Sequence, residues 1–299
     1  MWTPDVCLYH FPCDDGFAAA WVVHRKWPEV MLVPTNYGLP FPDIDIVDKR
    51  LLIVDFSYKP DMLAGLATRA HSIIILDHHK TAEADLRHVQ RMAFPAGCDE
   101  IDRHFPNTNN SGVNVLAGFD MNRSGASLAW EFCFPRDRMP QLIRHVEDRD
   151  LWRMKLDATR RVSLYLRSHP YVFDLWTDIA LALDDIGGEG RKAVLAEARA
   201  IERFYDRKLA EIIPTATLRQ INRWKGVPVA HAPYAFASDL AHELLKAHPA
   251  APFAAVIVDA YGARTYSLRS EDSREDVSEV ARLFGGGGHR NAASFRVPA

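Results

Sequence analysis

The sequence lacks the features that mark membrane and secreted proteins. No apolar stretch approaches the roughly 20 residues needed to cross a bilayer. The first residues have neither the basic start nor the apolar core of a secretory signal. Only four of the 299 residues are cysteine and none forms a C-x-x-C pair, so we expect reduced thiols and no disulfide framework. These absences predict a cytoplasmic protein that has no membrane as a partner.

The sequence also has little net charge. A formal charge of −3 provides no general attraction to nucleic acid or to an anionic membrane. We therefore expect no long nucleic acid as a partner, and any phosphate binding must come from a local site. Hydrophobic residues make up 48% of the chain and charged residues 25%, which is the balance of a globular protein. A chain of this length can hold two domains of ordinary size.

The most distinctive stretch is an apolar run at residues 72–76 that ends in Asp77, His78 and His79. A short apolar run of this kind predicts a strand buried on both faces, as in parallel sheets covered by helices. Such a strand ends at the carboxyl edge of the sheet, where open α/β folds bind ligands. Carboxylate and neutral imidazole are ligands for divalent transition metals. We interpret the three polar residues as a metal or catalytic site, and a solvated strand end is the simpler alternative.

Two further predicted strands end in residues of the same kinds. Residues 6–10 predict a strand that ends in His10, and a turn then leads into a helix for which Asp15 is a candidate N-cap. Another buried apolar run is followed directly by Asp55. Strands that alternate with helices predict a parallel sheet, whose strand ends converge on one edge. The residues that we expect to meet at this edge are His10, Asp15, Asp55 and His78.

Two helices are predicted in the middle of the chain. The first, over residues 141–152, ends in a charge cluster in which Asp148 and Asp150 are both candidates for a further carboxylate ligand. The simpler alternative for this cluster is a solvated helix end. The second helix, over residues 191–213, has one apolar face and one charged face. We interpret it as a connection between two domains.

The last part of the chain predicts a second, smaller α/β unit. Residues 254–260 and 264–269 flank a hairpin turn. Further on, a run of four glycines at 285–288 is followed by His289 and Arg290. Glycine leaves backbone N–H groups accessible to an anion, so we interpret this run as a phosphate-binding loop, with a flexible tail as the simpler alternative.

In the order of these motifs the sequence resembles the DHH phosphoesterase superfamily, which is named after the Asp-His-His run. The resemblance covers most of the chain, and its motifs are His10 to Gly16, Asp55, Asp77 to His79, Asp148, and the glycine run with His289. The first and fourth motifs are similar to the branch related to oligoribonucleases and exopolyphosphatases. The resemblance implies a parallel-sheet catalytic domain, a helical linker and a smaller α/β domain for substrate, with the active site in the cleft between the domains. The implied boundaries of these parts are 1–160, 161–225 and 226–299.

The resemblance also implies roles for these residues. Two Mn²⁺ (or Mg²⁺) ions are expected, with Asp55 as the bridging ligand. His79 is expected to face the substrate phosphate, and Asp77 to orient the histidines. The implied metal ligands are His10, Asp15, Asp55, His78 and Asp148. The implied substrate-binding residues are Arg269, Gly286, Gly287, Gly288 and His289.

The sequence departs from the family pattern in three places. The family usually has two acids separated by one residue before the first-motif glycine, and here the first of them falls on Cys13. Either Cys13 is a thiolate ligand, or Asp14 takes the role, or the first metal site is weak or empty. Ser294 stands where the glycine motif usually ends in a further glycine, a change that a strand start tolerates. Both Asp148 and Asp150 fit the fourth motif, and Asp148 has the better spacing to the following aromatic residue.

The resemblance implies a metal-dependent phosphoesterase that hydrolyses phosphodiester bonds of short oligonucleotides or small nucleotides. A phosphatase acting on nucleoside bisphosphates or polyphosphate is an alternative. The missing first-motif acid motivates another, a catalytically impaired nucleotide-binding regulatory protein. We prefer the enzyme because the other ligand positions are filled, and crowded carboxylates without a cation cost stability. Whether the chain forms a homodimer is left open.

Overall fold

The structure, a computed structural model, describes residues 2–92, 97–101, 114–260 and 262–298. The chain divides into two compact units, Met1–Ile201 and Glu202–Ala299. The three-part division predicted from the sequence, with boundaries at 160 and 225, stays a prediction. Among the described residues, no helix combines the length and the apolar composition that a bilayer span requires.

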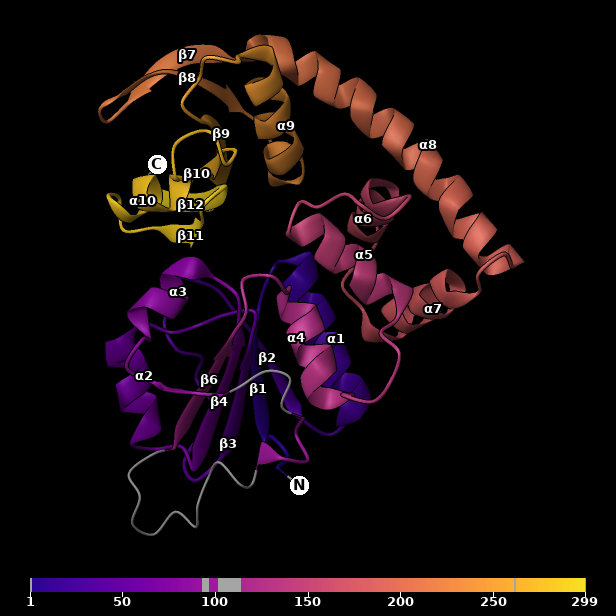
Figure 1. Cartoon of the computed structure of the whole chain (residues 1–299), viewed down its shortest axis with the longest axis vertical. Helices are drawn as coiled ribbons and strands as arrows, with labels where there is room; N and C mark the ends of the chain where they lie inside the picture. The colour runs from indigo at the N-terminus through magenta and orange to yellow at the C-terminus, as the bar shows by residue number, and fades with distance from the viewer. Residues whose placement is uncertain (1, 93–96, 102–113, 261, 299) are drawn as a thin grey trace. The chain divides into compact units, whose positions relative to one another are not determined.

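The first unit is built on a six-stranded sheet with the strand order β2-β1-β3-β4-β6-β5 (Figure 1). Every strand pairing in this sheet is parallel, which confirms the parallel sheet predicted from the sequence. Because β3 lies between β1 and β4, the carboxyl ends of these three strands are neighbours. The strands are β1 (Val6–His10), β2 (Met31–Thr35), β3 (Arg50–Val54), β4 (Ser72–Asp77), β5 (Gln90–Arg91) and β6 (Val115–Phe119).

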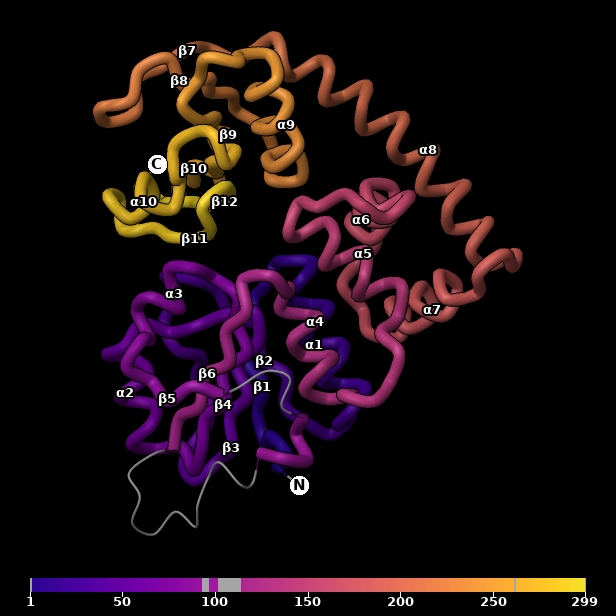
Figure 2. The backbone as a smooth tube through the Cα atoms, in the orientation of Figure 1, coloured from indigo at the N-terminus to yellow at the C-terminus, as the bar shows by residue number. Residues whose placement is uncertain are grey.

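Helices cover both faces of this sheet, which explains why β3 and β4 are apolar throughout. Alternate residues such as Leu52 and Ile74 pack in one core with α1 and α4, whereas Leu51 and Ile73 pack in a second core with α2. Fully burying each such side chain contributes about 1.5–3 kcal/mol. Figure 2 traces the backbone through these layers. The helices are α1 (Asp14–Lys26), α2 (Pro60–Ala67), α3 (Lys80–Asp85) and α4 (Gly125–Cys133).

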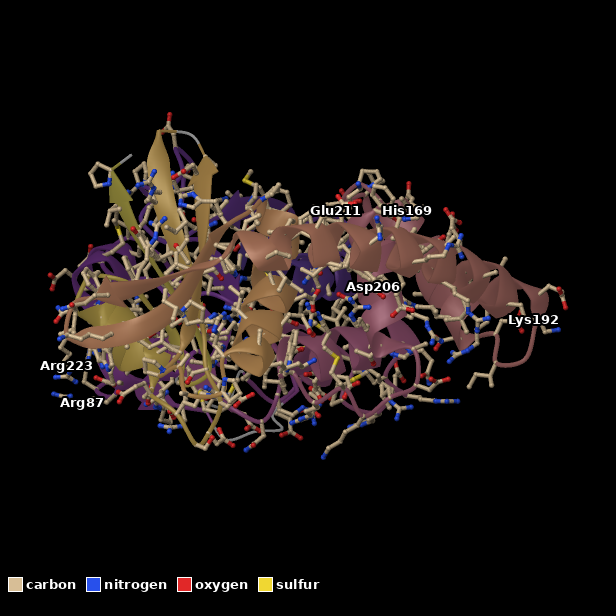
Figure 3. The ribbon with its side chains drawn as sticks, turned by 90° about the horizontal axis from the view of Figure 1, so that it is seen from above. Arg87, His169, Lys192, Asp206, Glu211 and Arg223 are labelled. Carbon is tan, nitrogen blue, oxygen red and sulfur yellow. The ribbon has the colours of Figure 1, made fainter. Side chains whose placement is uncertain are left out.

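Further helices extend the first core. Val146 of α5 (Gln141–Asp150), Val162 of α6 (Thr159–Arg167) and Trp176 of α7 (Phe173–Asp184) are buried in the same cluster as α1 and α4. Helix α8 (Glu189–Ile212) confirms the long helix predicted over 191–213, and it spans the boundary between the two units. Most of its charged residues are exposed, as the three labelled along it in Figure 3 illustrate: Lys192, Asp206 and Glu211.

The second unit contains a mixed six-stranded sheet with the order β11-β12-β10-β9-β8-β7. Strands β9 and β10 pair antiparallel, which confirms the predicted hairpin, although residue 261 in its turn lies outside the described residues. Two helices, α9 (Tyr234–Ala247) and α10 (Val277–Arg282), belong to this unit. The strands are β7 (Thr217–Ile221), β8 (Trp224–His231), β9 (Ala254–Ala260), β10 (Ala263–Arg269), β11 (Gly287–His289) and β12 (Ala292–Pro298).

The glycine run has a structural role in this unit. Residues Gly287–His289 form β11, which pairs with β12. A Cβ atom on Gly286 would lie 2.1 Å from the carbonyl oxygen of Ser294, so only glycine allows the two segments to approach this closely. The glycines therefore have a packing reason to be present, and phosphate binding by this segment stays a prediction.

Candidate metal centre

Polar side chains from three strand ends meet at the carboxyl edge of the parallel sheet. His10 ends β1, while Asp55 and His78 directly follow β3 and β4. Nδ1 of His10 lies 3.4 Å from Oδ2 of Asp55, and Nε2 of His78 lies 3.1 Å from Oδ1 of the same carboxylate. Asp55 is 1% exposed. The strand order thus places one buried carboxylate between two imidazoles.

Asp15 joins this cluster from the first turn of α1. Its Oδ2 lies 3.5 Å from Nε2 of His78. Both of its oxygens also accept hydrogen bonds from the first turn of α4, from the N–H of Gly125 (2.6 Å) and of Ala126 (3.0 Å). The predicted N-cap role of Asp15 in its own helix is wrong, because α1 begins at Asp14 with Cys13 in the N-cap position. The carboxylate instead binds the positive end of a helix 110 residues further along the chain.

The start of α4 packs directly on Asp55. A Cβ atom on Gly125 would lie 2.4 Å from the Cβ of Asp55, so a larger residue here would displace the carboxylate. Ser124 forms a capping box with Ser127. Asp55 itself has a φ of 54°, a left-handed conformation that costs a non-glycine residue about 1–3 kcal/mol. The packing of α4 and the hydrogen bond from the Asp55 N–H to the carbonyl of Leu76 (2.9 Å) hold it there.

Cys13 and Asp14 are the two candidates to replace the missing first-motif acid, and the structure distinguishes between them. The ligand atoms of His10, Cys13 and Asp55 all lie within 4.8 Å of one another. The carboxylate of Asp14, in contrast, accepts hydrogen bonds from Nε of Arg167 (2.7 Å) and the hydroxyl of Tyr171 (2.9 Å). Cys13 is therefore placed to complete a site with His10 and Asp55, and Asp14 is not.

The structure brings Asp150 to the cluster and not Asp148, which corrects the sequence-based preference. Oδ2 of Asp150 lies 3.6 Å from Nε2 of His78. The carboxylate of Asp148 accepts hydrogen bonds from the N–H groups of Lys155 and Leu156 and from the hydroxyl of Thr159. Side chains two positions apart on a helix point about 200° away from each other around its axis, so only one of these two acids can face the histidines.

Asp77 orients the second histidine of the motif. It is fully buried, and its Oδ2 accepts a hydrogen bond from the Ser57 hydroxyl (2.6 Å). Its Oδ1 accepts from the backbone N–H of His78 (2.8 Å) and contacts Nδ1 of His79 (2.7 Å). A carboxylate at this distance makes Nδ1 of His79 the protonated nitrogen and fixes the ring.

The cluster is crowded with negative charge. Burial, followed by the charges of Asp55 and Asp150, raises the pKa of Asp15 well above its usual value. Burial also opposes charge on Asp55, but the imidazoles of His10 and His78 beside it hold its pKa well below the usual range. Burial lowers the pKa of His78, yet the hydrogen bond to Asp55 and the charge of Asp150 outweigh it and raise this pKa to about 10. The carboxylates thus depend on positive charge close to them.

These residues fit a divalent cation. Carboxylate, imidazole and thiol groups are donors for transition metals, and among the described residues three clusters of three such side chains contain Asp55. In one of them the other members, Asp77 and His79, are already paired with each other, which leaves two as candidate ion sites. Nδ1 of His10 and Oδ2 of Asp55 are buried and have no hydrogen-bond partner among the residues described. A cation held by the lone pairs of these two atoms would satisfy both of them. The two donor clusters that remain as candidate sites are His10, Cys13 and Asp55, and Asp15, Asp55 and His78.

One residue at the cluster was not selected from the sequence. Tyr37 follows β2, and its ring centroid lies 5.6 Å from that of His10 and 5.7 Å from that of His79. Its only sequence signal is its place just after a strand of the parallel sheet. The predicted substrate-binding residues Arg269 and His289 belong to the second unit, where Arg269 donates hydrogen bonds to Ser238 and to its own strand.

Comparisons with known proteins agree with this fold. No family model matches the chain. It is 29% identical over 312 residues to uncharacterized protein R106 of Acanthamoeba polyphaga mimivirus, which covers 97% of this chain and 67% of that protein. It is 33% identical over 260 residues to oligoribonuclease NrnB of Bacillus subtilis (strain 168), which covers 83% of this chain and 59% of that protein. The chain thus spans about two thirds or less of these relatives.

A solved structure shares the fold. The DHH domain of a member of the s1p family of ribosomal proteins aligns with a TM-score of 0.51 at 12% identity, over 98% of this chain and 82% of that one. Fold and site together define an α/β protein with buried carboxylates and histidines at the carboxyl edge of a parallel sheet. The Asp77-His78-His79 motif, the fold and the similarity to an oligoribonuclease all support the DHH phosphoesterase superfamily for this chain.

Proposed function

We propose that the protein is a metal-dependent phosphoesterase that hydrolyses phosphodiester bonds of short oligonucleotides or small nucleotides. The observation that carries the proposal is the pair of donor clusters that share the buried carboxylate of Asp55. The similarity to an oligoribonuclease supports a nucleotide substrate. The formal charge of −3 supports a short substrate, because a long nucleic acid requires a basic track.

We propose Mn²⁺ or Mg²⁺ as the cofactor, with two ions that share Asp55. His10 and Cys13 would complete the first site. Asp15 and His78 would form the second, and Asp150 takes the place that the sequence assigned to Asp148. Bound cations of this kind make hydroxide available near neutral pH and neutralise charge on phosphate oxygens.

The chain's own residues would position the substrate. Asp77 holds Nδ1 of His79, so this ring keeps a single orientation in which it can donate to a substrate phosphate. The cationic side chain of Arg269, the glycines of residues 286–288 and His289 remain our candidates for binding substrate from the second unit. The location of the substrate in a cleft between domains also remains a prediction, as do the cytoplasmic location and a homodimer.

The test uses the purified chain with Mn²⁺ and four substrates: a dinucleotide, a five-residue RNA, a nucleoside bisphosphate and polyphosphate. We expect turnover of the dinucleotide or the RNA that EDTA abolishes. Asp55→Asn should lower kcat by about 1,000-fold or more, because it removes the shared ligand. Asp14→Asn is the matched control: this acid lies beside Arg167 and Tyr171, so metal content and rate should stay close to wild type.

Other outcomes would replace the proposal. Turnover of the bisphosphate or polyphosphate alone would make the protein a phosphatase. No turnover of any substrate, combined with tight nucleotide binding in EDTA, would identify an impaired nucleotide-binding protein.

A further inference from the structure

Tyr37 lies at the carboxyl edge of the sheet, two residues beyond the end of β2. Its ring contacts the rings of His10 and His79 edge-on, at interplanar angles of 67° and 72°. The ring of Phe56 lies beside it, with the centroids 4.6 Å apart. One aromatic side chain therefore touches a histidine of the first donor cluster and the histidine that Asp77 orients.

The hydroxyl of Tyr37 lies in an acidic environment. Burial raises the pKa of this hydroxyl well above its usual value, the nearby charges of Asp77 and Asp55 add to the effect, and the backbone amide of Ser57 opposes it. A phenol hydroxyl has one proton to donate as well as lone pairs that accept. The residue as a whole nevertheless remains 41% exposed, so a ligand at the cluster can reach part of its surface.

Packing alone does not account for the hydroxyl. A phenylalanine would make the same ring contacts with His10, His79 and Phe56. The backbone amide of Ser57 can donate only to the hydroxyl oxygen, which leaves the hydroxyl proton available to a ligand. A phosphate group bound at the donor clusters would bring acceptor oxygens to this donor. We propose that the Tyr37 hydroxyl donates a hydrogen bond to a phosphoryl oxygen of the substrate, which makes Tyr37 a catalytic residue of the site.

This inference rests on the proposed phosphoesterase function and deepens it. Negative charge on the phosphoryl oxygens changes during the reaction, and a donor held in place before the reaction stabilises that charge without reorganising. The hydroxyl should therefore contribute mainly to kcat and less to KM.

The experiment compares Tyr37→Phe with Tyr58→Phe. The first variant keeps the ring and removes only the hydroxyl. The second removes the hydroxyl of a neighbouring tyrosine that packs on the same Phe56 ring but pairs with Thr35 at 3.2 Å. Three quantities are measured in each variant: kcat and KM on a dinucleotide with Mn²⁺, the affinity for Mn²⁺ by calorimetry, and the affinity of the Mn²⁺-loaded protein for inorganic phosphate.

We expect Tyr37→Phe to lower kcat by about 100-fold and to weaken phosphate binding, with Mn²⁺ affinity unchanged. Tyr58→Phe should behave as wild type. Unchanged kcat and phosphate affinity in Tyr37→Phe would overturn the inference, and so would a loss of Mn²⁺ affinity as large as the loss of rate. If the wild type turns over no phosphodiester, the proposed function fails, and the phosphate affinities alone decide the role of Tyr37.

Discussion

Several physical demands meet at the single residue Asp55. It is buried, its backbone is left-handed, and its two carboxylate oxygens face His10 and His78. Gly125 closes the remaining side, where a Cβ atom would overlap with the aspartate. The burial and the left-handed backbone each lower the stability of the fold. Together with the packing of Gly125 they hold the carboxylate in a single orientation. Such local cost is typical of residues kept for function.

Cys13 is the residue at which this chain differs most from the pattern of its superfamily. A thiolate is a softer ligand than a carboxylate and favours Zn²⁺ or Cd²⁺ over Mn²⁺. We predict that Cys13→Asp shifts the ratio of Cd²⁺ to Mn²⁺ affinity toward Mn²⁺ by about 10-fold or more. Equilibrium dialysis gives both affinities, and ultraviolet absorption of the Cd²⁺–thiolate bond should be present only in the wild type.

Cys98→Ala provides the control for this prediction. Cys98 is a buried thiol that packs in the same hydrophobic core as α1 and α4. Its removal should leave the affinity ratio as it is. An identical ratio in wild type and Cys13→Asp would show that Cys13 does not coordinate the cation.

Among the secondary-structure elements, helix α5 decides which acid reaches the cluster. Its last turn carries Asp148 and Asp150 on opposite sides. Asp150 points to His78, whereas Asp148 binds the segment that leads into α6. Burial alone would raise the pKa of Asp148, but hydrogen bonds from Thr159, Leu156 and Lys155 lower it. One helix thus supplies a candidate ligand and an anchor for its neighbour.

This division of roles predicts different defects in two variants. Asp150→Asn should weaken Mn²⁺ binding by about 10-fold or more with little change in stability. Asp148→Asn should retain Mn²⁺ binding and lower the free energy of unfolding by about 2 kcal/mol, because a charged acceptor of several hydrogen bonds is lost. Calorimetry and urea unfolding measure the two effects. The reverse pattern would assign the ligand role to Asp148 after all.

At the scale of the whole molecule, the candidate metal ligands and the predicted substrate-binding residues belong to different units. The donor clusters belong entirely to Met1–Ile201, and the predicted substrate-binding residues to Glu202–Ala299. His145 lies in the core of the first unit, outside the donor clusters, and is a titratable group that links the stability of the protein to pH. His145 is 2% exposed, and its Nδ1 lies 2.9 Å from the Thr159 hydroxyl. Burial and the charge of Arg191 lower the pKa of His145 to about 4.

The stability of the protein should therefore fall in mild acid. The unfolded chain takes up a proton at His145 near pH 6.5, whereas the folded chain takes it up only near pH 4, so stability is lost as the pH falls between these values. The shift corresponds to a loss of about 2 kcal/mol between pH 7 and pH 5. His145→Asn, which can still donate to Thr159, should lack this component. Urea unfolding in EDTA should show the two proteins converging in stability at low pH, and parallel curves would contradict the prediction.

The sequence by itself was sufficient to predict the parallel sheet, because apolar runs such as 72–76 can only be buried on both faces. It also identified three strand ends, at His10, Asp55 and His78, since neighbouring parallel strands end on one edge. The order of the motifs was enough to recognise the superfamily. These inferences depend only on where apolar runs lie in the chain and which polar residues follow them, and both can be read directly from the sequence.

Only the tertiary structure decided where the remaining side chains point. Asp15 binds a helix 110 residues away, Cys13 faces the cluster while Asp14 turns to Arg167, and Asp150 replaces Asp148. Tyr37 is recognisable only once the rings around it are placed. The reason is physical: the direction of a side chain depends on the rotation of its helix and on packing against segments far away in the chain, and neither leaves a mark in the local pattern of residues.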